Sequence, residues 1–94
     1  MPHIIIFNPK NGTRTLFGLE KRLTKIGRLS DNDVALADDR VSRYHAEIIR
    51  QAEDEYLIQD LNSSNGTFLR VAGETELNAG DYILMGQQLF RIDF

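Results

Sequence analysis

Apolar and polar residues alternate along most of this 94-residue chain, and turn-forming residues interrupt the alternation every eight to twelve residues. The chain's end shows the pattern clearly, because Phe90, Ile92 and Phe94 fall on one face of an extended strand and the residues between them on the other. A period of two is typical of strands, and breakers at this spacing are typical of β-sandwiches. The pattern predicts an all-β fold, a β-sandwich built as a single domain over residues 1–94.

Ten strands are expected, separated by turns such as Asn8–Gly12, Ala52–Glu55 and Ala79–Asp81. They span residues 3–7, 14–19, 21–26, 34–36, 44–51, 56–60, 67–71, 75–78, 82–85 and 87–94. No stretch has the 3.6-residue period of an amphipathic helix.

Composition excludes several classes of protein. Hydrophobic content of 41% and charged content of 27% are ordinary for a globular domain. No apolar run is long enough to span a membrane, and Met1–His3 is not the basic start of a secretory signal, so a cytoplasmic location is expected. The absence of cysteine excludes disulfides, thiolate metal sites and a cysteine nucleophile, and no cofactor or metal is expected. A net charge of -3 argues against nucleic acid and anionic membrane partners, which require a basic face.

Three polar clusters interrupt the expected strands: Gly27-Arg28, the run from Ser42 to His45, and the run from Ser63 to Thr67. Loops at one end of a sandwich converge, so these clusters can form one pocket. Arginine brings a permanent planar charge, serine a rotatable hydroxyl, and asparagine a donor and an acceptor. Together they predict a local anion site suited to phosphate. Each cluster alone is more typical of turn glycines, capping residues and a solvated arginine than of a binding site.

The order and spacing of the clusters resemble the forkhead-associated (FHA) family over nearly the whole chain. The family pattern is a Gly-Arg pair, Ser-Arg-x-His-Ala, Asp-Leu-x-Ser-x-Asn-Gly-Thr and Gly-Asp-x-Ile-x-x-Gly. This chain has Gly27-Arg28, Ser42–Ala46, Asp60–Thr67 and Gly80–Gly86 in that order. The second Asn-Gly turn of many members is replaced here by residues 68–73.

The resemblance implies a sandwich of two twisted sheets with about eleven strands and ligand loops at one end. It also implies a non-catalytic signalling module that binds phosphothreonine in an extended peptide of a serine/threonine kinase substrate. Together with the alternation, it predicts that eight side chains are buried between the sheets: Ile5, Ile26, Ala46, Ile48, Ile58, Ile83, Leu84 and Phe90.

The resemblance implies that Arg28 is the main phosphate ligand and that the hydroxyl of Ser42 donates to another phosphate oxygen. Ser64 stands where the family often has threonine, and its hydroxyl would make the same phosphate contact. Asn65 would hold the main chain of the peptide. Arg43 would contact the phosphate or a neighbouring peptide residue.

Arg40 resembles the position that chooses the third residue after the phosphothreonine, which favours an acidic residue there. The acidic residues Asp31, Asp33, Asp38 and Asp39 flank this site and oppose that preference. Gly27, His45 and Gly66 are expected to have structural roles, His45 by bracing the loops from within.

Two alternatives remain open at this stage. Some family members assemble without phosphate, and the sheet faces of this chain would suit such a scaffold or oligomerisation role. Ser42, His45 and Asp60 supply the residue types of a hydrolase triad, although a 94-residue sandwich has little room for a substrate cavity. Because the chain stops at Phe94 within an expected strand, we expect it to be part of a longer protein.

Overall fold

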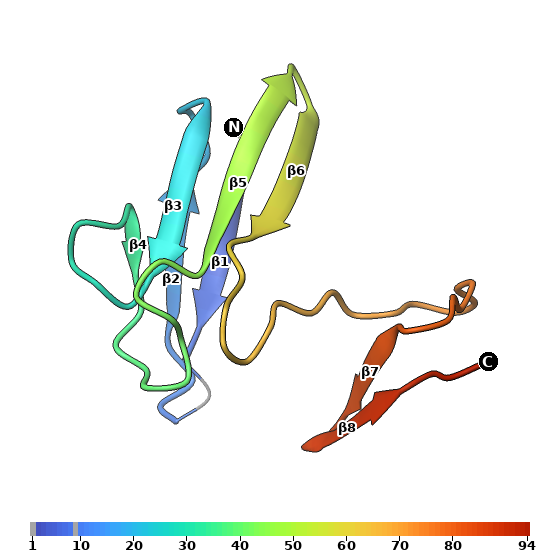
Figure 1. Cartoon of the computed structure of the whole chain (residues 1–94). Coiled ribbons are helices and arrows are strands. Elements are labelled where there is room, and N and C mark those ends of the chain that lie inside the picture. Colours follow the sequence, from blue (N-terminus) through green and yellow to red (C-terminus); the bar gives the residue numbers. More distant parts are fainter. Residues whose placement is uncertain (1, 9) are drawn as a thin grey trace.

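The computed structural model describes residues 2–8 and 10–94, so Pro9 of the expected Asn8–Gly12 turn lies outside the described residues. The fold is all-β, as predicted (Figure 1). Its eight strands are β1 (His3–Phe7), β2 (Arg14–Gly18), β3 (Leu23–Gly27), β4 (Val34–Ala35), β5 (Ala46–Ala52), β6 (Glu55–Asp60), β7 (Tyr82–Met85) and β8 (Gln88–Arg91). The count over the described residues is therefore eight, where the resemblance implied eleven.

The largest sheet has four strands in the order β4-β3-β5-β6. Strand β4 runs parallel to β3, and the other neighbours are antiparallel. Registers Thr24↔Ile48 and Ile48↔Ile58 place these side chains on one face of the sheet, called here the inner face. Thr24 and Ala46 on this face are 1% and 3% exposed, so the core lies against β3 and β5. Strand β5 begins later than expected, because Ser42–His45 form a loop.

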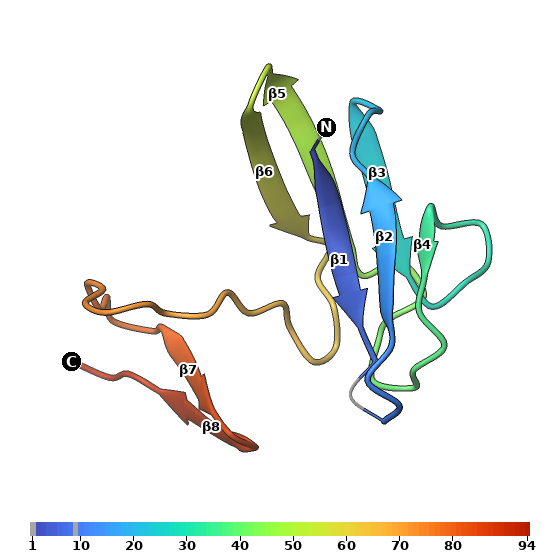
Figure 2. The same cartoon turned by 180° about the vertical axis from the view of Figure 1, so that it is seen from behind.

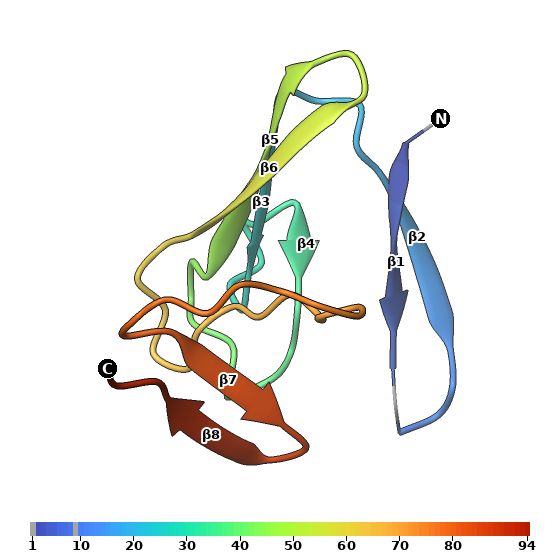
Figure 3. The same cartoon turned by 90° about the vertical axis from the view of Figure 1, so that its right-hand side faces the viewer.

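The hairpin β1–β2 forms a second layer that faces this sheet (Figure 3). Strand β1 lies nearer to β5 and β6, and β2 nearer to β3 and β4 (Figure 2). Ile4 and Phe17 pair across the hairpin and are half-buried, whereas Ile5 and Leu16 of the opposite face are exposed. The hairpin is only two strands wide, so it covers only part of a four-stranded sheet.

Residues 68–94 form what we call the C-terminal arm. Its first part, residues 68–77, is extended but pairs with no other strand among the described residues, so the expected strands at 67–71 and 75–78 are wrong. The hairpin β7–β8 follows, paired from Tyr82↔Arg91 to Met85↔Gln88. Both views of the molecule show this hairpin standing apart from the four-stranded sheet (Figures 1 and 2).

The arm stands off from the sheet, which explains the failed burial predictions at Ile58, Leu84 and Phe90, whereas Ile5 is exposed because it lies on the face of the β1–β2 hairpin opposite Ile4. Ala46 is buried and Ile26, Ile48 and Ile83 are half-buried, but four other residues of the predicted core are substantially exposed. These are Ile5 (43%), Ile58 (53%), Leu84 (46%) and Phe90 (45%). Alternation correctly placed Ile58 on the inner face, but it could not show that no second layer covers that face over β6.

Candidate functional site

The first loop follows β3 at Gly27, where the chain passes unusually close to the second loop. A Cβ added to Gly27 would lie 2.3 Å from the carbonyl oxygen of Arg43 and 2.8 Å from the side-chain nitrogen of Asn32. Separations under about 3 Å do not occur between such atoms, so only glycine fits here. This close approach brings Arg28 next to the Ser42–Arg43 backbone.

Arg28 is held at two points and free at its tip. Its backbone N–H donates to the carbonyl of Ser42 (3.0 Å), and its Nε donates to the carbonyl of Val41 (3.1 Å). The side chain is exposed, and its two terminal nitrogens make no hydrogen bond within the part of the chain that the structure describes. The guanidinium is therefore oriented by one nitrogen and presents two nitrogens with four N–H groups to a ligand.

Asn32 fastens the first two loops together, a role that sequence reasoning missed. It is 7% exposed, and its Nδ2 donates to the carbonyls of Leu29 (2.8 Å) and Arg43 (2.9 Å). Its Oδ1 is buried without a partner among the described residues. The polar run 30–33 signalled a turn, but nothing in it distinguished the buried Asn32 from its exposed neighbours.

His45 joins the second and third loops. Its Nδ1 accepts from the backbone N–H of Ser42 (3.0 Å), so its Nε2 carries the proton and donates to the carbonyl of Gly66 (3.0 Å). The imidazole is only 12% exposed. These bonds are those of a group that braces loops.

The same geometry argues against the hydrolase alternative. In a triad, a ring nitrogen of the histidine faces the serine hydroxyl. Here Nδ1 of His45 faces the backbone N–H of Ser42, and within the described residues no hydrogen bond joins the imidazole to the Ser42 hydroxyl. Asp60 Oδ1 lies 3.9 Å from Nε2, beyond hydrogen-bond length.

Ser42 contributes its side chain to the meeting point of the loops. Its Oγ accepts a hydrogen bond from the backbone N–H of Ser64 (3.0 Å), and its own hydroxyl hydrogen remains available for donation. The hydroxyl of Ser64 and the guanidinium of Arg43 are exposed and make no hydrogen bond within residues 2–8 and 10–94. The four side chains predicted to contact an anion therefore lie on adjoining loops. Arg28 is on the first loop, Ser42 and Arg43 are on the second, and Ser64 is on the third.

The third loop is organised by Asp60. Its carboxylate accepts from the hydroxyls of Ser63 (2.5 Å) and Thr67 (2.7 Å) and from the backbone N–H of Ser63 (3.1 Å). Ser63 Oγ in turn accepts from the N–H of Gly66 (3.0 Å), which has a positive φ of 85°. The hydrogen bonds from the hydroxyls of Ser63 and Thr67 are the main reason that the pKa of Asp60 lies below its ordinary value.

Asn65 and Arg40 connect the third loop to the second. Asn65 Nδ2 donates to the carbonyl of Arg40 (2.8 Å), leaving its second N–H and its oxygen without a bond among the described residues. Arg40 itself is 84% exposed in its side chain and is paired with Asp38 through Nη2 (3.2 Å) and Nε (3.3 Å). The Arg40 hydrogen bonds lower the pKa of Asp38.

The acidic residues beside the site are mostly engaged. Asp33 pairs with Lys21 and accepts from the N–H of Lys25 (2.8 Å), and these contacts lower its pKa. Asp31 accepts from the hydroxyl of Tyr44 (2.7 Å), which raises the pKa of Tyr44. Asp33 and Asp38 therefore each have a cationic partner that opposes their effect on an anion, whereas the partner of Asp31 is an uncharged hydroxyl.

Other kinds of site find no support in the described residues. They contain no group of three or more His, Cys, Asp or Glu side chains arranged to hold a metal ion. They also contain no helix with the length and apolarity to cross a membrane.

Comparison with known proteins places this architecture in a family. The FHA domain model matches residues 24–86, which include all three loops. A solved FHA domain studied for phosphothreonine-dependent interactions superimposes with a TM-score of 0.57 and 32% identity, covering 96% of this chain and 93% of that one. EmbR of Mycobacterium tuberculosis, solved in complex with a low-affinity phosphopeptide, superimposes with a TM-score of 0.56 and 35% identity over 95% of this chain and 24% of EmbR.

Two curated relatives are larger proteins. The transcriptional regulatory protein EmbR of M. tuberculosis is 43% identical over 70 residues, 71% of this chain and 18% of EmbR. The oxoglutarate dehydrogenase inhibitor of Corynebacterium jeikeium is 39% identical over 88 residues, 92% of this chain and 58% of the inhibitor. The chain thus spans less than two thirds of the length of either relative. A family match over most of the chain, together with the shared fold, shows that this chain belongs to the forkhead-associated family.

Proposed function

We propose that this FHA domain binds phosphothreonine-containing peptides and so recruits substrates of a serine/threonine kinase in the cytoplasm, without catalysis. The observation that carries the proposal is the state of Arg28 and Ser42. The loops that carry the two terminal nitrogens of Arg28 and the hydroxyl hydrogen of Ser42 are joined by hydrogen bonds, and no other described residue uses these donors. A phosphate with about -1.5 to -2 charges and three acceptor oxygens matches these donors.

The relatives support the ligand class. EmbR has been solved with a phosphopeptide, and the FHA domain with the TM-score of 0.57 was studied for phosphothreonine-dependent interactions. Both superimpose over at least 95% of this chain, which supports the same ligand class for the loops described above.

Each loop contributes a distinct part of the proposed recognition. Arg28 makes charge-assisted bonds to the phosphate, worth about 1.5 to 3 kcal/mol each. Ser42 donates its hydroxyl, and Ser64 and Arg43 add a second hydroxyl and a second charge. Asn65 uses its remaining N–H and its oxygen to hold the main chain of an extended peptide.

The proposal can be tested by measuring, with calorimetry, the affinity of the domain for one phosphothreonine peptide, for the same peptide without phosphate, and for its phosphoserine version. Binding is expected only for the phosphothreonine peptide. Arg28→Ala should weaken it by about 2 to 4 kcal/mol, the value of a bidentate charge-assisted contact. Arg22→Ala is the matched control, because Arg22 precedes β3 at the end of the strand opposite Gly27.

Two results would overturn the proposal. Equal affinity for the phosphorylated and unphosphorylated peptides would favour a phosphate-independent scaffold. Equal affinity of the wild-type protein and Arg28→Ala would remove Arg28 from the phosphate site.

A further inference from the structure

The C-terminal arm carries apolar side chains on both of its hairpin faces. Register pairs place Leu84 with Leu89 on one face and Ile83 with Phe90 on the other. Leu84, Leu89 and Phe90 are 46%, 55% and 45% exposed. A two-stranded hairpin is marginal in water without a partner for its apolar face, so the arm is built to pack against another element.

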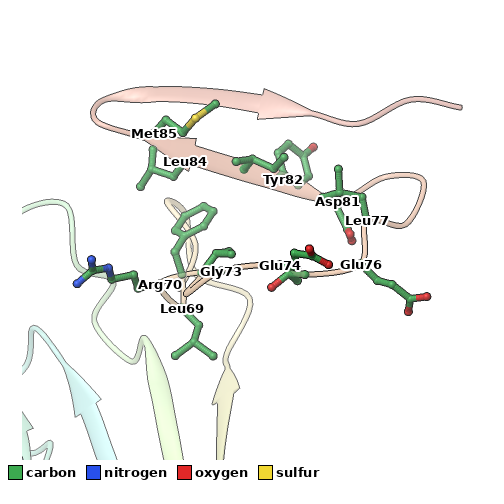
Figure 4. Close-up of a pocket in the computed structure, with 14 residues that line it drawn as sticks. Leu69, Arg70, Gly73, Glu74, Glu76, Leu77, Asp81, Tyr82, Leu84 and Met85 are labelled. Atoms are coloured by element: carbon green, nitrogen blue, oxygen red, sulfur yellow. The ribbon is translucent and has the colours of Figure 1, made fainter.

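The arm also has an apolar groove of about 940 Å³ between its extended part and β7 (Figure 4). Leu69 and Leu77 line it from the extended part, and Tyr82, Leu84 and Met85 line it from β7. The groove is distinct from the three loops around Arg28. It adds to the apolar surface that the arm leaves open.

The body of the domain has a matching open surface on its inner face. Ile58 of β6 points to the same face as the buried Ala46 and Thr24, yet it is 53% exposed. In the part of the chain that the structure describes, the second layer consists of β1 and β2 alone, and β1 is its outer strand on the side of β6. The space over Ile58, beside the outer edge of β1, therefore lacks the strands that would complete the second layer.

The overall dimensions measure how much surface is left open. A compact monomer of 10.7 kDa exposes about 5,500 Å², whereas this chain exposes 7909 Å². Its radius of gyration is 14.7 Å, against about 12 Å for a compact domain of this length. The excess of about 2,400 Å² per chain is of the size that stable dimers bury.

The direction of the arm favours a second copy of this chain as the occupant. Hydrogen bonds from Ser63, Thr67 and Gly66 fix the third loop immediately before the arm. From there the arm runs outward, away from the sheet (Figures 1 and 2). For the hairpin to cover Ile58 of its own chain, residues 68–81 would have to turn back toward the four-stranded sheet. If the hairpin packs on a neighbouring chain, these residues keep the direction that they have here.

We propose that two chains form a dimer by exchanging their C-terminal arms, each β7–β8 hairpin completing the second layer over Ile58 of the other chain. The interface is isologous, because each chain gives an arm and receives one. The exchange buries one apolar face of the hairpin together with the inner face of β6. This inference does not depend on the proposed phosphothreonine binding.

The first test is the molar mass of the intact chain in solution. Light scattering after size exclusion should give twice 10.7 kDa at protein concentrations from about 10 μM upward. Ile58→Asp, which places a charge in the covered space, should shift the protein toward the monomer. A monomeric mass up to millimolar concentration would overturn the proposal, and peptide binding by that monomer would leave the proposed function intact.

A second test separates exchange from other dimers and from closure within one chain. The chain has no cysteine, so Ile58→Cys combined with Leu84→Cys gives two unique thiols for a bismaleimide cross-linker. The expected product joins two different chains. Glu53→Cys with Leu84→Cys is the control, because Glu53 lies in the β5–β6 turn away from the inner face. A product linked only within one chain, or no product, would contradict the exchange.

Discussion

At the scale of single residues, the site depends on side chains that would never touch a ligand. Asn32 holds two carbonyls, His45 joins two loops, and Gly27 allows the backbones to meet. Arg28 and Ser42 can be oriented only because these three residues fix the main chain around them. Binding should therefore be sensitive to changes beneath the site as well as in it.

Gly27→Ala tests this dependence. A Cβ 2.3 Å from the Arg43 carbonyl forces the loops apart, which should cost about 1 to 3 kcal/mol of stability and also weaken peptide binding. Gly18→Ala is the control, since its Cβ would meet only the flexible end of Glu20 at 3.3 Å. Denaturant unfolding and calorimetry measure both effects. Gly27→Ala with wild-type stability and affinity would show that the close approach does not matter.

Asp60 should make the stability of the third loop depend on pH. Hydroxyl donors lower its pKa in the folded state, so its contribution to stability is fully present above the unfolded pKa of about 3.9 and is lost as pH falls through the lower folded value. Urea unfolding between pH 3 and 7 should show the wild-type protein exceeding Asp60→Asn most near neutral pH. The difference should shrink below about pH 4. Ser63→Ala removes one hydroxyl donor and should show part of the stability loss of Asp60→Asn near neutral pH. If the stabilities of wild type and Asp60→Asn differ by the same amount at every pH from 3 to 7, the prediction is contradicted.

At the scale of loops and strands, the pairing of Arg40 with Asp38 would limit the part that Arg40 is proposed to take in ligand selection. An acidic peptide residue can use Arg40 only by displacing the Asp38 carboxylate, which holds two of its nitrogens. The wild-type domain should therefore show a weak preference for acid three residues after the phosphothreonine. This reconciles the two opposing expectations raised by Arg40 and its acidic neighbours.

Asp38→Asn should strengthen that preference. Removing the charge frees the exposed Arg40 guanidinium, and because an exposed ion pair is weak, the gain should be modest, up to about fivefold. Two phosphothreonine peptides that differ only in Asp or Ala at the third following position give the comparison. An unchanged ratio of affinities between wild type and Asp38→Asn would place Arg40 outside ligand selection.

The sequence predicted elements well where pairing was local and poorly where it was not. The hairpins β1–β2, β5–β6 and β7–β8 follow from alternation around short turns. The segment at 67–71 has the β-branched and aromatic residues of a strand but pairs with no strand among the described residues, and local composition cannot reveal that. The order of the loop residues in the chain predicted Arg28, Ser42 and Asn65 as binding residues, which stays a prediction, whereas the structural role of Asn32 was missed because its burial depends on contacts across 11 residues.

At the scale of the whole molecule, the small core limits what one chain can stabilise alone. Leu19, Val34 and Ala46 are the buried apolar residues of the described chain, and Ile58, Leu84 and Phe90 lie largely open. Alternation assigned these open residues to the core because it reports which face a side chain takes. It carries no information on which chain, or which layer, covers that face.

Arm exchange makes thermal stability depend on concentration. Association that occurs only between folded chains shifts unfolding by mass action, so the melting temperature should rise steadily from micromolar to millimolar protein. Calorimetric scans over that range provide the measurement. Ile58→Asp should flatten the dependence, and a wild-type melting temperature that stays constant would count against association.

The contact between Tyr44 and Asp31 provides an optical reporter beside the site. The chain has three tyrosines and no tryptophan, so tyrosine dominates its near-ultraviolet absorption. The bond to Asp31 raises the pKa of Tyr44, while the charge of Arg43 acts in the opposite direction. A phosphate that neutralises Arg43 would remove this opposing effect and shift phenolate absorption to higher pH. Occupancy of the site could thus be followed by ultraviolet titration of the unlabelled protein.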